Sequence, residues 1–281
     1  MTPDDTTSGS EKTGGPRRKI ADGPTNNATS LERAKDLRSR AERRADIPLR
    51  QSFVRSDKPG TTPPLAQLVN TRGRGGVVAL QLYLALVWLI SSPPFESRPV
   101  RAATWAELLD LPDPTGRGRR RILDALRKLE ELKLVTVTRA PGKEVTVNLL
   151  HESGNGKPYG QVPSTAYVRA PEAQDRIVYF RLNTKLWTEG HIQTLSAKAL
   201  AMLLVILEEH YGDYRRRVWW NQGTFEERFK LSRSTLSEGT QELCRRNLIS
   251  IRREFVSTSG SAFAAQTKRN TYKVKGSAIP S

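Results

Sequence analysis

Cysteine, histidine and long apolar runs are scarce in this chain of 281 residues. A single cysteine, Cys244, excludes an internal disulfide framework. None of the three histidines has a second histidine or a cysteine at the spacing of a zinc site, so we expect no bound metal; they are His151, His191 and His210. The apolar stretch Val77–Ile90 is too short to span a bilayer and is interpreted as a buried helix.

Groups for catalysis or nucleotide binding are also missing. The run Glu208–His210 could offer two metal ligands, but three consecutive residues at a helix end point in different directions, so a solvated helix end is the favoured interpretation. The Gly-rich run Thr71–Gly76 lacks the Lys-Ser/Thr ending of a phosphate-binding loop and is interpreted as a flexible basic connection. We therefore expect no enzymatic activity, no catalytic residues and no cofactor.

Acidic residues are few beside the basic ones. The chain has 29 Asp and Glu against 46 Lys and Arg, a formal net charge of +17, which attracts polyanions such as DNA or RNA. Membrane surfaces attract basic proteins too, but no lipidation motif and no basic amphipathic helix with bulky aromatic residues is present, so no membrane partner is expected. The start of the chain has no charged-then-apolar signal sequence, so we expect a cytoplasmic, nucleoid-associated location.

The segment Phe225–Ile249 predicts a short helix, a tight turn, a second helix and a strand. Ser232 is suited to cap the second helix, because its side-chain oxygen can accept a free N–H of the first turn. Leu236, Gly239 and Leu243 recur at spacings of three and four residues, which predicts the buried face of that helix.

A hairpin is predicted to follow this helix. Ile249–Phe255 alternates like a strand, Arg269–Val274 can return as its partner, and Ser257–Thr267 would form a flexible tip. Two helices joined by a turn and followed by a hairpin are the layout of a winged helix, which places its second helix in the major groove of DNA.

The same pattern occurs earlier in the chain. The corresponding segments are Thr104–Leu111 with Thr224–Leu231, Arg119–Leu129 with Arg233–Leu243, and Leu134–Val137 with Leu248–Ile251. An apolar helix precedes each copy, at Val77–Ile90 and at Leu195–Leu207. The first copy also ends in a predicted hairpin, Val135–Val147, which turns at Pro141-Gly142. Two copies of the pattern in register indicate winged helices more strongly than a single match does.

These patterns predict an α+β protein, mainly α, with two tandem winged helix-turn-helix domains and a disordered basic N-terminal arm. The expected parts are an arm at 1–60, a first domain at 61–150, a linker at 151–176, a second domain at 177–276 and a tail at 277–281. Within the arm, Leu31–Ala45 has helical propensity, but its apolar stripe is too thin to bury a helix, so we expect a solvated helix there. A strand at Ile177–Leu182 would open the second domain.

The predicted DNA contacts lie on the second helix of each copy and on the second hairpin. The first of these helices begins with a dense positive edge suited to phosphates, and the second with mixed donors and acceptors suited to base edges. The predicted DNA-binding residues are Arg117, Arg119, Arg120, Arg121, Arg233, Ser234, Thr235, Ser237, Gln241, Arg252, Arg253, Lys268 and Arg269. Trp219 and Trp220 are expected to pack in the core, with stacking on a base as the alternative.

Three segments resemble blocks in a group of actinobacterial proteins that are predicted to bind DNA: Leu82–Pro94, Trp105–Pro114 and Leu200–Leu207. The resemblance covers most of the chain beyond Leu65. Two winged helices in one chain also resemble plasmid replication initiators, and the helix at 232–247 is similar to helices of bacterial winged-helix transcription regulators.

We therefore expect sequence-specific binding to double-stranded DNA, as a bacterial transcriptional regulator or, alternatively, as a plasmid-type replication initiator. A homodimer is compatible with either role. A different class of function is also open: an assembly module that uses winged helices to contact other proteins and not DNA. The arginines from Arg117 to Arg121 argue against it, because unpaired charge buried in a protein interface is costly.

Overall fold

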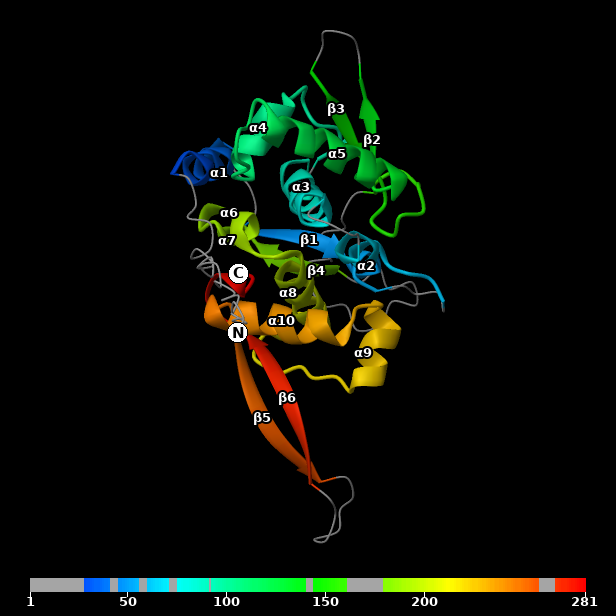
Figure 1. Ribbon diagram of the computed structural model, residues 1–281, viewed down its shortest axis with the longest axis vertical. Helices are drawn as coiled ribbons and strands as arrows, with labels where there is room; N and C mark the ends of the chain where they lie inside the picture. The colour runs from blue at the N-terminus through cyan, green and yellow to red at the C-terminus, as the bar shows by residue number, and fades with distance from the viewer. Residues whose placement is uncertain are drawn as a thin grey trace, which may run out of the picture.

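The computed structural model describes residues 28–40, 45–55, 60–70, 75–90, 92–139, 144–160, 179–257 and 266–281. Over these ranges the chain is a mixed α+β protein with three small, two-stranded antiparallel sheets, of which β1–β4 lies among the helices and the other two are hairpins that project from them (Figure 1). This confirms the expected α+β class. In the same ranges, none of the helices combines the length and the apolar character that crossing a membrane requires.

The helices are α1 (Ala28–Arg40), η1 (Gln51–Phe53), α2 (Pro64–Val69), α3 (Gly75–Leu89), α4 (Ala102–Leu108), α5 (Arg117–Glu131), α6 (Lys185–Thr188), α7 (His191–Thr194), α8 (Ala197–Glu209), α9 (Gln222–Phe229), α10 (Arg233–Arg245) and η3 (Gly276–Ala278). The strands are β1 (Asp46–Arg50), β2 (Val135–Thr138), β3 (Thr146–Leu149), β4 (Tyr179–Asn183), β5 (Ile249–Ser257) and β6 (Gln266–Val274).

The order apolar helix, two helices and hairpin occurs twice, as α3-α4-α5-β2-β3 and as α8-α9-α10-β5-β6. The two units also end alike. Lys133 and Asn247 both adopt a positive φ after the last helix, and the next N–H, of Leu134 or Leu248, bonds back to the carbonyl of Leu129 or Leu243 at 3.0 and 2.9 Å. The hairpins project from opposite ends of the long axis (Figure 1).

The two units share one hydrophobic core. Helices α3 and α8 are apolar on nearly all sides and are buried at its centre. Gln81 of α3 donates through Nε2 to the carbonyls of Ile192 and Gln193 in α7, at 2.8 and 3.1 Å, which satisfies a buried amide and ties the first unit to the segment that precedes α8. The rings of Trp88 and Trp187 lie 5.1 Å apart in the same region. α3 also contacts α8 directly, so the two units pack against each other around this core.

A strand inside the predicted arm corrects the expected chain organisation. β1 pairs antiparallel with β4, with Ile47 opposite Leu182 and Leu49 opposite Phe180. All four of these side chains are buried, so the burial of both strands holds the pairing in place. The strand predicted to open the second domain is thus present at β4, but its partner comes from the segment predicted to be part of an N-terminal arm.

The helix α1 is packed, not solvated as predicted. Ala34 is fully buried, and the Ser30 hydroxyl donates to the carbonyl of Leu108 at 2.8 Å. Arg33 pairs with Glu107 of α4 at 2.5 Å, and α1 also contacts α6. The apolar stripe is thin, but two polar contacts with α4 supplement it. The rest of the predicted disorder, at residues 1–27, lies outside the described residues.

The first part of the predicted linker is also packed. Glu152 is fully buried and pairs with Arg50 at the end of β1, whose guanidinium also donates to the Gly160 carbonyl at 2.9 Å. The rings of Tyr159 and Tyr179 lie 4.9 and 5.1 Å from the same guanidinium. Burial is the largest single effect on the pKa of Arg50 and lowers it, but the field and hydrogen bond of Glu152, together with Tyr179 and Tyr159, outweigh burial and raise the pKa of the guanidinium. Residues 161–176 of the linker lie outside the described residues.

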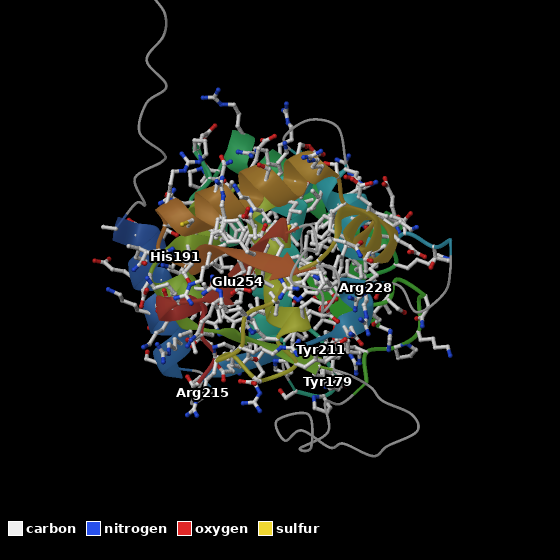
Figure 2. The ribbon with its side chains drawn as sticks, turned by 90° about the horizontal axis from the view of Figure 1, so that it is seen from below. Tyr179, His191, Tyr211, Arg215, Arg228 and Glu254 are labelled. Carbon is white, nitrogen blue, oxygen red and sulfur yellow. The ribbon has the colours of Figure 1, made fainter. Side chains whose placement is uncertain are left out.

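The end of α8 is buried, which corrects the prediction of a solvated helix end at Glu208–His210. Glu208 accepts a hydrogen bond from Gln51 and lies 3.4 Å from the Nε of Arg55. Burial raises the pKa of its carboxyl to about 7, and Arg55 opposes that shift. Glu209 pairs with Arg228 of α9 at 2.8 Å; Arg228 is one of the side chains labelled in Figure 2. The carboxylates therefore anchor the β1–η1 segment and α9 to α8.

Candidate nucleic-acid interface

A cap at its first turn fixes where helix α10 begins, and a close contact with α8 fixes which side of it is buried. Ser232 caps it as predicted, accepting from the Thr235 N–H at 3.2 Å. Gly239 faces the backbone of α8, and a Cβ there would lie only 2.4 Å from the Lys198 carbonyl oxygen. The predicted buried face is present, because Gly239 and Leu243 are buried and Leu236 packs partly against the core.

Replacing Gly239 with alanine is expected to destabilise the fold by about 1–3 kcal/mol, because the added methyl group overpacks the α8–α10 contact. The higher helix propensity of alanine, worth up to about 1 kcal/mol, offsets only part of this cost. Gly223→Ala in α9 is the matched control, since a Cβ there meets nothing nearer than 3.8 Å. Urea unfolding of both variants measures the difference; equal midpoints would contradict the close packing.

The exposed side of α10 carries most of the predicted contacts. Arg233, Ser237 and Gln241 are exposed, and so is Ser234, although its hydroxyl lies 3.5 Å from the Lys198 ammonium. Thr235 is the exception: it is 2% exposed, so the prediction that it contacts DNA is wrong. Its position one turn before Gly239 turns it toward the core, where its hydroxyl meets that of Ser232 at 3.1 Å.

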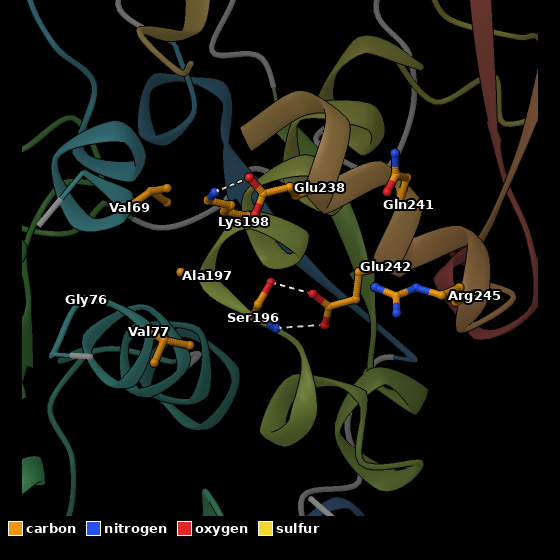
Figure 3. A pocket seen from close by; sticks show the side chains of 10 residues that line it. All are labelled: Val69, Gly76, Val77, Ser196, Ala197, Lys198, Glu238, Gln241, Glu242 and Arg245. Carbon is orange, nitrogen blue, oxygen red and sulfur yellow. Dashed lines mark hydrogen bonds and ion pairs between the residues drawn. The ribbon is translucent and has the colours of Figure 1, made fainter. Parts of the chain in front are cut away.

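A groove of about 550 Å³ borders the second half of α10 (Figure 3). Its lining comes from α2, α3, α8 and α10 and consists of Val69, Gly76, Val77, Ser196, Ala197, Lys198, Glu238, Gln241, Glu242 and Arg245. Its carboxylates are engaged: Lys198 pairs with Glu238 at 2.7 Å, and Glu242 accepts from the Ser196 N–H at 3.0 Å. Sequence reasoning missed Ser196, Lys198 and Glu242, because no local pattern shows which distant helices will meet.

Helix α5 presents the predicted positive edge. Asp113, at a positive φ, accepts from the N–H of Arg117 at 2.9 Å and so closes the first turn. The Arg117 side chain is 86% exposed and lies 3.9 Å from the same carboxylate. Arg119 and Arg120 are exposed and have no carboxylate partner among the described residues, whereas Arg121 is half-buried. The stripe Ile122, Leu126 and Leu129 holds the opposite side of α5 in the core.

The four predicted hairpin contacts divide between its two faces. Arg253 and Lys268 lie on the same face of the hairpin as the buried Ile249. Arg253 is four residues after Ile249 in β5, Lys268 pairs with Phe255, six residues after it, and side chains alternate between the two faces along a strand. Arg252 and Arg269 lie on the other face.

Arg269 is the least available of these four cations. Its guanidinium lies 4.1 Å from the ring centroid of Trp219 and 3.7 Å from the Glu254 carboxylate, so its charge is already engaged within the protein. Trp219 itself is 46% exposed, which contradicts the expectation that it packs in the core, whereas Trp220 is half-buried against Phe225 and Tyr272.

Arg217 packs against the face of the hairpin that carries Arg252 and Arg269. It donates to the Thr271 hydroxyl at 2.7 Å and to the carbonyls of Ser250 and Thr271 at 3.0 and 2.8 Å. Its partial burial and the nearby charge of Arg252 lower the pKa of its guanidinium. The hairpin is therefore braced at its base.

The described residues contain no cluster of three or more His, Cys, Asp or Glu side chains that could hold a metal ion. No family model matches this chain, and no curated protein or solved structure matches it either. The exposed cations, the groove and the hairpin are the features of the described residues that bear on function.

Proposed function

We propose that the protein binds double-stranded DNA in a sequence-specific way through two winged-helix units and acts as a bacterial transcriptional regulator. The units are α3-α4-α5-β2-β3 and α8-α9-α10-β5-β6, with α5 and α10 as their recognition helices. The observation that carries the proposal is that Arg119, Arg120 and Arg233 are exposed on the first turns of these two helices without a carboxylate partner among the described residues. The first turn of a recognition helix is the part that enters the major groove.

The charge balance supports DNA over a protein partner. A net charge of +17 in 281 residues favours a polyanion, and exposed cations without partners would be costly to bury in a protein interface. A DNA backbone supplies a counter-charge for each of them, and the release of condensed ions adds to the affinity.

A plasmid-type replication initiator is the second candidate, supported by the presence of two such units on one hydrophobic core in a single chain. The two roles use the same DNA-binding surface and differ in the target. Binding selection from random duplexes identifies the preferred sequence. Its location upstream of a regulated gene supports the regulator, and an array of repeats beside a replication origin supports the initiator.

The two recognition helices are expected to respond differently to the loss of one arginine. Arg233→Ala should cost about 1–3 kcal/mol on a selected site and relax the preference at one base pair. Arg120→Ala should weaken selected and scrambled duplexes alike, because a phosphate contact carries no sequence information. Fluorescence anisotropy at a fixed salt concentration measures both.

Arg127→Ala is the matched control on α5. It removes the same charge, but Arg127 is 66% exposed and already paired with Asp124 at 3.0 Å, so it should have a smaller effect than Arg120→Ala. An Arg233→Ala variant that loses equal affinity for both sequences would show that α10 does not read bases. Absence of duplex binding by the unmodified chain at low salt would refute the proposed function.

A further inference from the structure

Phe255 on β5 is the most exposed large apolar side chain among the described residues, with 63% of its surface in solvent. It stands opposite Lys268 of β6, and the ammonium of that lysine lies 5.3 Å from the ring centroid. Exposing this much aromatic surface to water is unfavourable, and the neighbouring core is already complete without it. The ring is therefore available to a ligand.

The surroundings of Phe255 define the chemistry of that ligand. The adjacent pair on the same face is Arg253 and Asn270, and both are exposed. Nearer the core, this face continues into Ile251 and Tyr272. It carries no acidic residue in the described strands, because Glu254 lies on the opposite face beside Arg269 and Arg217, at 3.7 and 3.9 Å. The outer half of the face thus combines an aromatic ring, two cations and an amide.

We propose that this face of the hairpin binds single-stranded DNA, with one unpaired base stacked on Phe255 and the neighbouring phosphates contacting Lys268 and Arg253. An aromatic ring flanked by cations is the arrangement with which proteins hold a single strand, because every base has a π-face and every nucleotide a phosphate. This activity is additional to duplex reading by α5 and α10 and does not depend on it.

Two other occupants fit the same face less well. A second copy of the hairpin would place Arg253 and Lys268 against the same cations, and like charges repel at close range. A base within an intact duplex is covered on both sides by its stacked neighbours, so its π-face cannot reach a ring on the surface of a hairpin. An unpaired base meets both requirements, because its face is free and its strand carries negative charge.

The test uses the full chain and a labelled oligothymidylate of about 16 nucleotides, a length that covers the usual single-strand sites and cannot pair with itself. Phe255→Ala is expected to weaken its binding roughly 5- to 150-fold, which corresponds to the loss of one base stacked on an aromatic ring. Phe255→Tyr should retain most of the affinity. Phe255→Leu should lose about as much as the alanine variant, since leucine is apolar but has no π-face.

Ile279→Ala is the matched control, because Ile279 is also exposed, at 39%, but lies beyond the hairpin. It should bind the oligonucleotide like the unmodified chain. Phe255 makes little contact with the core, so circular dichroism spectra of the variants should coincide.

Three results would overturn this inference: no oligothymidylate binding at low salt, unchanged affinity in Phe255→Ala, or full affinity in Phe255→Leu. Duplex binding by the same preparations is measured in parallel. If the duplex binds and the single strand does not, only the single-strand activity is refuted. If the single strand binds and no duplex does, the proposed regulator function fails instead.

Discussion

Replacing Glu152 with alanine should lower the free energy of unfolding by about 3–5 kcal/mol, the cost of removing one partner from a buried ion pair. The side chains of Arg50 and Glu152 are 5% and 0% exposed, so the remaining guanidinium could not recover its hydration. The Gly160 carbonyl and the rings of Tyr159 and Tyr179 would still contact it, but none of them carries a compensating charge. Guanidinium chloride unfolding at neutral pH gives the difference.

Two variants show whether burial is the reason. Glu144→Ala breaks a surface ion pair with Arg101, whose side chain is 79% exposed. It should lower the free energy of unfolding by no more than about 1 kcal/mol. The double variant Arg50→Met, Glu152→Leu removes both charges and should recover most of the loss, because an apolar pair of similar volume needs no counter-charge. A Glu152→Ala protein as stable as Glu144→Ala would mean that water reaches Arg50.

Affinity for a selected duplex is expected to fall by about a thousandfold or more between roughly 50 and 200 mM salt, if roughly six to ten phosphates are contacted. The exposed cations on α5, α10 and the second hairpin are sufficient for contacts of that number. Each neutralised phosphate releases condensed counterions, so the logarithm of the affinity falls linearly with the logarithm of the salt concentration. Titrations at several salt concentrations measure the slope.

The double variant Arg119→Ala, Arg120→Ala should reduce that slope by about two phosphates, since both side chains are exposed and without carboxylate partners among the described residues. Arg127→Ala, which breaks an existing surface pair, should reduce it less. A slope that is flat in the unmodified chain would contradict a backbone-binding surface. A slope unchanged in the double variant would place the contacts away from α5.

Local pattern in the sequence was enough to predict the repeated elements. Helix α10 starts after Ser232 and buries Gly239 and Leu243, because capping and a spacing of three or four residues act within one helix. The hairpin β5–β6 follows from alternation in neighbouring segments. The surplus of positive charge needs no structure at all, since it is a sum over the chain.

Only the tertiary structure decided where the predicted arm and linker lie. β1 is five residues long, contains Pro48 and pairs with β4 from the other half of the chain, so its partner leaves no trace in the nearby sequence. The burial of Arg50 against Glu152 depends on the same long-range contact.

The availability of each candidate side chain was likewise a tertiary property. Thr235 and Arg233 are neighbours in one polar run, but the packing of α10 on α8 buries the first and exposes the second. Arg269 and Lys268 are adjacent in β6, but the strand turns one toward Trp219 and Glu254 and the other toward Phe255. Sequence determines which chemical groups the protein carries; burial and pairing, which join residues far apart along the chain, determine which of them a ligand can reach.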